Sequence, residues 1–165
     1  MKRIIFIRHA KAEEMSSDKY DFERSLTLKG RETAHSMAKV LKEKAGGPGL
    51  IISSPAFRAL ETALIFARES GISPDAVRMN NLIYEHFNEN TIRQLLNRLE
   101  DETDTVSFVG HNFSLTDMAS WLAKDNCCEI PKCGIVSLSF NTGSWTGIHA
   151  GSGRIDLFLK PKEIL

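Results

Sequence analysis

Two short, largely apolar runs of the sequence are each followed closely by a histidine. Ile4–Ile7 is followed by Arg8 and His9, and Val106–Val109 is followed, after one glycine, by His111. Such runs predict strands buried on both faces of a sheet, and open α/β sheets bind ligands at the carboxyl ends of their parallel strands. An Arg-His pair by itself is equally compatible with a solvated loop, so it gains meaning only from what else reaches the same edge.

A second polar group precedes a predicted helix. Ser53 and Ser54 offer N-cap hydroxyls, and Pro55 suits the first helical turn, so we expect the helix to begin there. Arg58 then falls in the first turn, where the helix already carries partial positive charge. Two interpretations remain open at this point: a solvated arginine, or an anion site in which the guanidinium and the free backbone amides bind a phosphate together.

The elements that must position these residues alternate along the chain. Strands are predicted at 4–7, 50–52, 106–109 and, more briefly, within 77–84; helices at 27–45, 53–67, 92–99 and 115–122; and β-rich segments at 134–140, 144–149 and 154–159. A long loop is expected at 12–25. This order predicts one α/β domain over residues 1–165, a three-layer sandwich with a mainly parallel central sheet flanked by helices.

On that geometry Arg8, His9, Arg58 and His111 converge at one sheet edge. Two arginines, two histidines and a helix start suit a dianionic phosphoryl group, whose oxygens need several donors. A neutral imidazole can attack phosphorus, and the arginines disfavour the imidazolium, so we predict His9 as the nucleophile. The arginines would supply the charge that other phosphoryl-transfer enzymes take from magnesium, so no metal or other cofactor is expected.

The composition narrows the range of partners. The 165 residues contain 21 Lys and Arg against 21 Asp and Glu, a formal net charge of zero, so no overall field recruits nucleic acid or an anionic membrane. The chain has no signal-peptide core and no apolar stretch of membrane-spanning length. We therefore expect a soluble, cytoplasmic protein.

Three cysteines, Cys127, Cys128 and Cys133, fall within seven residues. Their odd number in a chain without a secretion signal argues against a disulfide framework. The spacing lacks a second ligand pair for zinc, so we expect structural or incidental thiols rather than a metal site.

Taken jointly, four motifs resemble the histidine phosphatase superfamily, which is phosphoglycerate mutase-like in fold. They are Ile-Arg-His-Ala-Lys-Ala at 7–12, Leu26-Thr27 with Gly30, Ser-Ser-Pro-Ala-Phe-Arg-Ala-Leu-Glu-Thr-Ala at 53–63, and Val-Gly-His-Asn at 109–112. The chain looks most like the short bacterial phosphohistidine phosphatases. The resemblance implies that His9 is transiently phosphorylated while Arg8, Arg58 and His111 bind the phosphate. We therefore expect phosphate or vanadate to inhibit.

The chain also departs from the family pattern. Ala10 replaces the glycine of the Arg-His-Gly signature, and Lys11-Ala12-Glu13-Glu14 replaces the extension found in sugar-phosphate and phosphoglycerate enzymes, which disfavours a mutase. Glu85 stands roughly where the superfamily often places its general acid, yet it is equally explained as a helix-start glutamate. The expected substrate is a phosphorylated protein carrying phosphohistidine. The alternatives are a small phosphoester substrate and, less favoured, a binding module without turnover.

Overall fold

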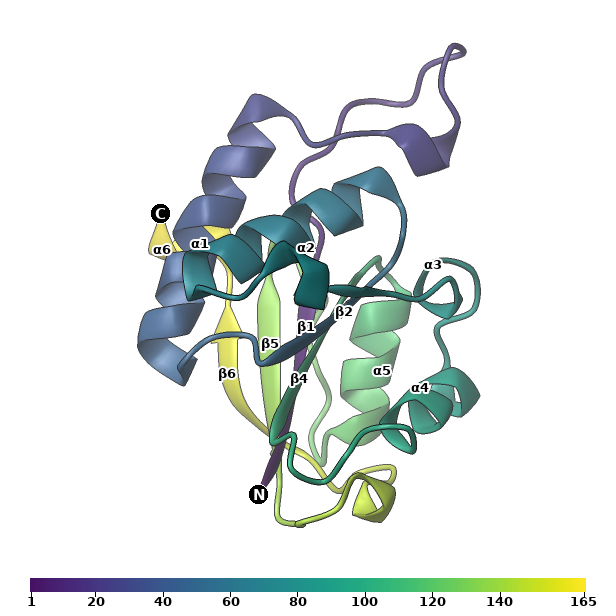
Figure 1. Ribbon diagram of the computed structural model, residues 1–165, viewed down its shortest axis with the longest axis vertical. Coiled ribbons are helices and arrows are strands. Elements are labelled where there is room, and N and C mark those ends of the chain that lie inside the picture. Colours follow the sequence, from purple (N-terminus) through teal and green to yellow (C-terminus); the bar gives the residue numbers. More distant parts are fainter.

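The computed structural model describes all of residues 1–165. Its centre is a six-stranded sheet in the order β3-β2-β4-β1-β5-β6 (Figure 1). The strands span β1 (Lys2–Arg8), β2 (Leu50–Ser53), β3 (Arg78–Met79), β4 (Thr105–Gly110), β5 (Ile135–Phe140) and β6 (Arg154–Leu159). The pairs β1–β4, β2–β4 and β2–β3 are parallel, whereas β5 is antiparallel to both β1 and β6. Only β5 therefore runs against the other strands, which confirms the mainly parallel sheet.

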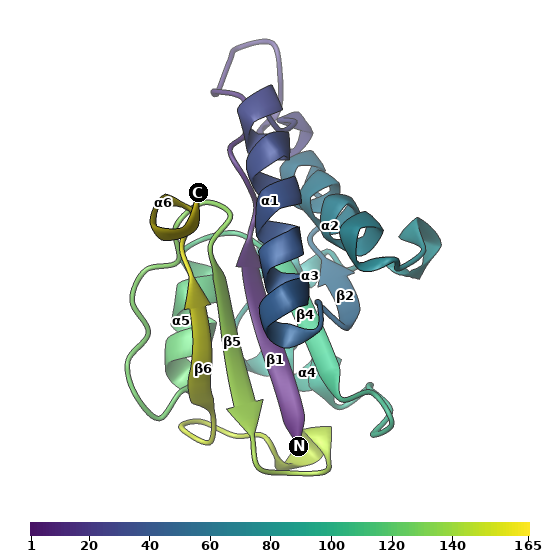
Figure 2. The same ribbon diagram turned by 90° about the vertical axis from the view of Figure 1, so that its left-hand side faces the viewer.

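Helices cover both faces of the sheet and give three layers, as the sequence predicts. On one face lie α1 (Leu28–Ala45) and α2 (Phe57–Ser70); on the other lie α3 (Leu82–Glu85), α4 (Glu89–Leu96) and α5 (Ser114–Leu122), while the short α6 (Pro161–Ile164) ends the chain. Figure 2, turned by 90°, shows α6 close to the end of the sheet where β1 finishes. None of the helices combines the length and the apolar character needed to cross a bilayer.

The unbroken apolar run of β1 packs against the helices on both faces of the sheet. Ile5 and Ile7 belong to the core cluster beneath α1 and α2, whereas Ile4 and Phe6 belong to the cluster on the opposite face, and all four side chains are fully buried. Alternate residues of a strand point to opposite faces, so a strand between two helical layers needs apolar residues at every position. This burial fixes where β1 ends, and with it the position of Arg8 and His9.

Helix α1 begins and ends where the sequence indicates. The Thr27 side chain accepts a hydrogen bond from the amide of Gly30 as an N-cap, and Gly46 ends the helix in the left-handed conformation with φ of 78°. Gly30 also lies against the chain that follows His9: a Cβ built on it would come within 2.1 Å of the carbonyl oxygen of Lys11. The absence of a side chain at Gly30 allows α1 to approach the backbone of the segment that follows His9.

The predicted start of α2 is wrong by a few residues. The N-cap is Ala56, which makes no side-chain cap hydrogen bond, and Pro55 precedes it outside the helix. The Ser54 hydroxyl accepts from the amide of Ala56 at 3.2 Å, so it stabilises the turn between β2 and α2 instead of capping the helix. The placement of Arg58 in the first turn is nevertheless correct.

Two further local predictions need correction. The segment 144–149 is not a strand: Trp145–Gly147 forms a 3-10 turn, because the buried Trp145 indole donates to the carbonyl oxygens of Glu100 and Thr103 at 3.2 and 3.0 Å and so docks beneath the loop before β4. His149 accordingly follows a turn, not a strand. The helix expected over 92–99 is α4, which ends at Leu96, so Leu99 lies in the turn beyond it.

Candidate active site

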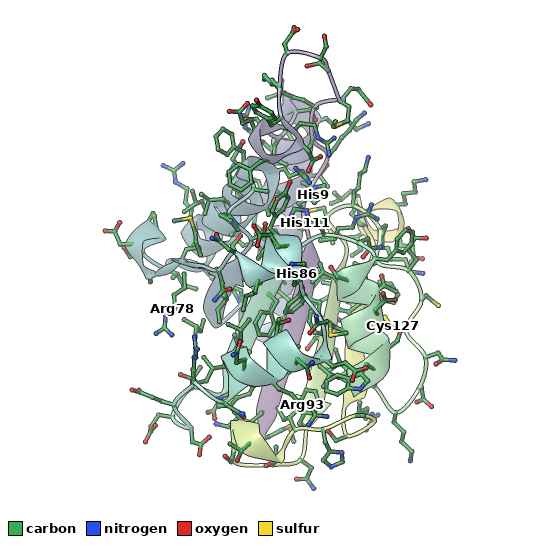
Figure 3. The ribbon with its side chains drawn as sticks, turned by 90° about the vertical axis from the view of Figure 1, so that its right-hand side faces the viewer. His9, Arg78, His86, Arg93, His111 and Cys127 are labelled. Carbon is green, nitrogen blue, oxygen red and sulfur yellow. The ribbon has the colours of Figure 1, made fainter.

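The two histidines meet at the carboxyl end of the sheet. Their strands β1 and β4 pair in parallel, with Arg8 opposite Gly110, so His9 and His111 leave the sheet side by side. Their ring centroids lie 5.3 Å apart. In Figure 3 the two side chains lie together, whereas Arg78 and Cys127 lie on opposite sides of the molecule, away from them.

The His9 ring is fixed in one orientation. Its Nδ1 lies 2.8 Å from the carbonyl oxygen of Ala10. A carbonyl only accepts, so we assign the imidazole proton to Nδ1 and the lone pair to Nε2. Burial, opposed by this hydrogen bond and aided by the charges of Arg58 and Arg8, lowers the pKa of His9 from 6.5 to about 4. At neutral pH His9 is therefore an uncharged imidazole with a directed lone pair, which is the form a nucleophile requires.

Arg58 faces that lone pair. It lies on the first turn of α2, its side chain is buried, and its Nε donates to His9 Nε2 at 3.3 Å. Its two remaining nitrogens bind Asp21, one donating to the backbone carbonyl at 2.7 Å and the other to the carboxylate at 2.9 Å. The Nε2 lone pair of His9 and a guanidinium able to bind phosphate therefore lie next to each other.

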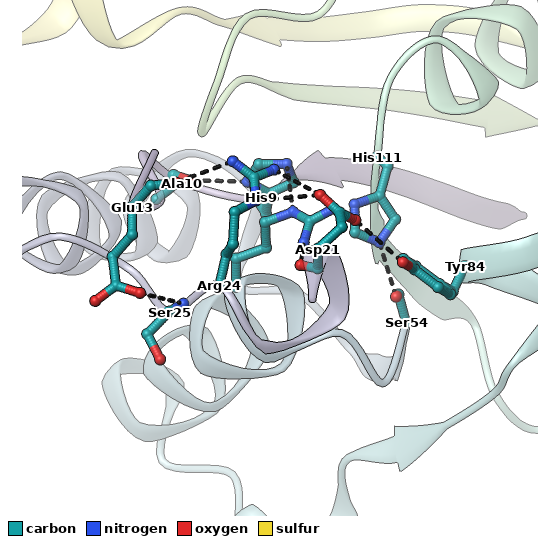
Figure 4. A network of polar contacts seen from close by, with 10 residues as sticks. His9, Ala10, Glu13, Asp21, Arg24, Ser25, Ser54, Tyr84 and His111 are labelled. Atoms are coloured by element: carbon teal, nitrogen blue, oxygen red, sulfur yellow. Dashed lines mark hydrogen bonds and ion pairs between the residues drawn. The ribbon is translucent and has the colours of Figure 1, made fainter. Parts of the chain in front are cut away.

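Asp21 connects the loop before α1 to the site. Its carboxylate also accepts from the hydroxyl of Tyr84 at 3.0 Å and pairs with Arg24 at 3.0 Å (Figure 4). Burial by itself would raise the pKa of Asp21, but the hydrogen bond and charge of Arg58 outweigh it, and the pKa lies below its ordinary value. Asp21 is therefore an anion bound to two arginines of the site, Arg58 and Arg24.

His111 is oriented by Ser54. Its Nε2 lies 2.8 Å from the Ser54 hydroxyl, which already accepts from the amide of Ala56 and so has its proton available to donate. This places the imidazole proton of His111 on Nδ1, an atom that is buried and has no partner in the protein. Burial, followed by the neighbouring His9 and Arg58, lowers the pKa of His111 to about 3. His111 is thus a neutral donor whose N–H is free to bind an oxygen.

Arg8 completes the cationic lining. One of its terminal nitrogens donates to the carbonyl of Ile130 at 2.9 Å and lies 3.7 Å from the carboxylate of Glu129. Its Nε is buried without a partner, a state that carries a free-energy cost unless a ligand or water satisfies it. Burial lowers the pKa of this guanidinium, although it stays cationic at neutral pH.

These residues enclose a pocket of about 220 Å³, which we call the anion pocket. Its lining consists of Arg8, His9, Ala12, Arg24, Arg58, His111, Asn112 and Lys132. Three arginines and one lysine thus face a space with no carboxylate in its lining. The chain also holds no group of three or more His, Cys, Asp or Glu side chains that could bind a metal ion.

Four of the five predicted site residues come together in this pocket, and Glu85 does not line it. Glu85 ends α3 with an exposed side chain that makes no hydrogen bond or ion pair. Its neighbour Tyr84 packs edge-on against His111, with ring centroids 5.5 Å apart. Tyr84 of α3 therefore contacts a residue of the pocket lining, His111, although it does not line the pocket itself.

Sequence reasoning missed Asp21, Arg24, Ser54 as the orienting partner of His111, and Lys132. Arg24 and Asp21 lie in the long loop, where no periodicity distinguishes a buried contact from a solvated charge. The length of that loop was the available signal, because long loops in compact domains are often functional. The three cysteines are free thiols, and Cys133 is buried.

The arrangement can perform one kind of chemistry directly. A phosphoryl group in the anion pocket would meet the lone pair of His9, while guanidinium groups and the N–H of His111 are available to its other oxygens. Donors fixed in advance around a developing negative charge lower the barrier to its transfer without reorganisation. The geometry therefore supports nucleophilic attack by an imidazole on phosphorus.

Comparison with known proteins gives a family for the chain. The model of the histidine phosphatase superfamily (branch 1) matches residues 4–122, which is the greater part of the sequence. This range includes the four predicted site residues that line the anion pocket, Arg8, His9, Arg58 and His111. A search among curated proteins finds no match to the sequence.

Solved structures share the whole fold. SixA from Agrobacterium tumefaciens, named as a phosphohistidine phosphatase, is 24% identical with a TM-score of 0.77, covering 97% of this chain and 98% of that one. The protein histidine phosphatase SixA in complex with tungstate is 16% identical with a TM-score of 0.80, covering 99% of both chains. A mycobacterial glucosyl-3-phosphoglycerate phosphatase is 17% identical with a TM-score of 0.67, covering 94% of this chain and 97% of that one. At these identities the likeness establishes the fold alone.

Proposed function

The chain belongs to the histidine phosphatase superfamily, and we propose that it hydrolyses phosphoryl groups through a phosphohistidine intermediate on His9, with phosphohistidine on a protein as the substrate. The observation that carries the proposal is the geometry of His9: its proton is on Nδ1, its Nε2 lone pair faces Arg58, and its pKa is lowered to about 4.

The reaction has two steps. In the first, the Nε2 lone pair of His9 forms a bond to phosphorus while the bond from phosphorus to the leaving group breaks, and the leaving group takes up a proton. In the second, water attacks the phosphorus, the bond to His9 Nε2 breaks, and phosphate departs. Arg8, Arg58 and the Nδ1–H of His111 bind the phosphoryl oxygens in both steps.

The choice of protein phosphohistidine rests on the leaving group. An alkoxide needs a well-placed acid to leave, whereas the imidazole of a phosphoramidate leaves more readily. The anion pocket has no carboxylic acid in its lining. The named activities of two relatives of the same fold, SixA proteins, point the same way.

A second candidate is a phosphatase of small phosphoesters in which Glu85 is the general acid. It is favoured by one observation: Glu85, the acidic residue of α3, directly follows Tyr84, whose ring packs against His111. In that case Glu85→Gln would slow ester hydrolysis more than phosphohistidine hydrolysis. That larger loss on esters, together with an outright preference for esters in the wild-type enzyme, would favour the second candidate over the first.

The central test is to trap the intermediate. Brief incubation with a ³²P-labelled phosphohistidine protein, followed by quenching, should leave phosphate on the enzyme that is stable to alkali and labile to acid. His9→Ala should show neither label nor turnover, whereas His149→Ala, an exposed histidine outside the site, should behave as wild type. Turnover without any label on the wild-type enzyme would exclude the covalent route.

The charge-supplying role of the arginines has its own test. We expect activity to survive chelators, because Arg8 and Arg58 supply the positive charge, and we expect phosphate and vanadate to inhibit by occupying the anion pocket. Inactivation by a chelator with recovery on adding a divalent ion would contradict this mechanism.

A further inference from the structure

A second, larger cavity adjoins the anion pocket. It has a volume of about 610 Å³, against about 220 Å³ for the anion pocket, and the two share Arg8 and Lys132 in their linings. Its walls come from the segment after β1, the first turns of α1, residues 129–133 and the C-terminal α6. Segments far apart in sequence thus form one groove beside the predicted nucleophile.

This groove has a strong excess of positive charge. Its cations are Arg8, Lys11, Lys29, Lys132, Lys160 and Lys162. Against these six stand two carboxylates, Glu129 and Glu163, an excess of four in a chain whose formal net charge is zero. We call this surface the lysine groove. Although the chain has no net charge, this groove next to the anion pocket therefore has a local excess of positive charge.

Most of these cations are unpaired. Glu163 pairs with Lys160 at 3.3 Å, and Glu129 lies 3.7 Å from Arg8. The side chains of the remaining lysines, Lys11, Lys29, Lys132 and Lys162, are exposed and make no ion pair or hydrogen bond within the protein. Gathering like charges in a concave surface is unfavourable by itself, so a complementary anion would stabilise this groove.

The kind of cation indicates the kind of anion. A dedicated site for one further phosphate would present buried, hydrogen-bonded donors in a fixed fork, as Arg58 does in the anion pocket. The lysine groove instead offers flexible, hydrated ammonium groups spread over four segments of the chain. Such groups suit several carboxylates at variable positions, as on the surface of a partner protein.

We propose that the lysine groove binds an acidic segment flanking the phosphorylated residue of a protein substrate, so that the enzyme selects phosphohistidine with Asp or Glu beside it. The proposal rests on the phosphatase function proposed above and specifies its substrate class. Because Arg8 and Lys132 line both spaces, a chain whose phosphoryl group occupied the anion pocket would pass directly into the groove.

The test compares two peptides of equal length, each with one phosphohistidine, one flanked by Glu and Asp and the other by Ser and Gly. Wild-type enzyme should hydrolyse the acidic peptide with a kcat/KM at least tenfold higher, and the advantage should shrink as salt is raised. Lys29→Glu with Lys162→Glu should remove the advantage while leaving hydrolysis of the neutral peptide and of phosphoramidate within about twofold. A matched control, Lys44→Glu with Lys124→Glu, makes the same charge change outside the groove.

Equal kcat/KM for the two peptides, or an equal loss in the control variant, would overturn the proposal. A binding measurement separates it from the proposed function: a fluorescent, unphosphorylated acidic peptide should bind the wild-type chain and not the Lys29→Glu, Lys162→Glu variant, whether or not the enzyme turns over. No hydrolysis of any phosphosubstrate would contradict the proposed function alone. Binding of inorganic triphosphate, but not of the acidic peptide, would assign the groove to a small polyanion and overturn the proposal.

Discussion

Asp21 binds Arg58 twice, through its carboxylate at 2.9 Å and through its own backbone carbonyl at 2.7 Å. A residue of the loop before α1 thus holds the guanidinium that faces the proposed nucleophile. The backbone contact fixes where the guanidinium lies, and the carboxylate adds a negative charge next to Arg58, which lines the anion pocket. These two effects act in opposite directions on phosphate binding, and they can be separated.

Asp21→Asn should strengthen inhibition by inorganic phosphate. The amide oxygen of asparagine and the unchanged backbone carbonyl can still orient Arg58, while the repulsion between a carboxylate and phosphate disappears. A single partly screened charge is worth about 1 kcal/mol, or roughly a fivefold lower inhibition constant. The measurement is phosphate inhibition of phosphoramidate hydrolysis, with the exposed Asp18→Asn of the same loop as control. Weaker inhibition would mean that the carboxylate acts mainly by aligning Arg58.

Arg58→Ala should lower kcat/KM by roughly 10²- to 10³-fold, the usual loss for one preorganised donor to a charged transition state. Steady-state kinetics measure the effect, and circular dichroism checks the fold. Arg78→Ala, an exposed arginine of β3 far from the pocket, should leave kcat/KM unchanged. A loss in kcat/KM below threefold for Arg58→Ala would show that Arg58 does not stabilise the transition state.

Ser54→Ala should reduce activity without removing it. The serine hydroxyl donates to Nε2 of His111 and so keeps the proton on Nδ1, where it can reach a phosphoryl oxygen. Without it, both tautomers of the imidazole become available, and we expect roughly a tenfold fall in kcat, comparable to weakening one neutral hydrogen bond. Ser114→Ala, which loses a hydroxyl bonded to the backbone carbonyl of His111, is the control and should have a smaller effect.

Gly30→Ala should destabilise the fold by about 3 kcal/mol, because the new Cβ would clash with backbone and not with a side chain that could move. The clash is with the carbonyl oxygen of Lys11, 2.1 Å from the Cβ position. Urea unfolding measures the loss. Gly143→Ala, where a Cβ would meet nothing within 4 Å, should change stability by less than about 0.5 kcal/mol. Similar losses in both variants would show that the contact with Lys11 has no special cost.

The free energy of unfolding should decrease as the pH is lowered from 6.5 to 4, because of His9. Its pKa is lowered to about 4 in the folded protein, so across this range the unfolded chain binds a proton that the folded chain does not. Between pH 7 and pH 5 this linkage removes about 2 kcal/mol from the free energy of unfolding. His9→Asn should lose correspondingly less than wild type over that range in urea titrations, whereas His149→Asn should follow wild type. Parallel pH profiles for wild type and His9→Asn would contradict the lowered pKa.

The sequence by itself was sufficient to predict the mainly parallel central sheet and four of the residues that line the anion pocket. Ile4–Ile7 has to be a doubly buried strand because it contains no polar residue, and Arg8 and His9 must then leave the sheet at its carboxyl end. The run Val106–Val109 of β4 contains one polar residue, Ser107, but its other three residues are apolar, and His111 follows it after Gly110. Arg58 was a candidate because a cation in the first turn of a helix conflicts with the helix dipole, and it was chosen over a solvated arginine only when the other motifs were considered with it. Each of these signals lies within a few neighbouring residues.

The remaining features depended on contacts between residues distant in sequence, which only the tertiary structure decided. Asp21 meets Arg58 across 37 positions, and a loop without periodicity carries no signal of which acidic residue turns inward. Ser54 could have capped α2 by its local sequence, yet its hydroxyl binds His111, 57 positions away. The β-rich segment around Trp145 was predicted to be a strand, but its indole docks under the loop before β4 because burying that ring and satisfying its N–H outweigh local preference. The lysine groove arises likewise, because α1 and α6 place Lys29 and Lys162 beside Arg8.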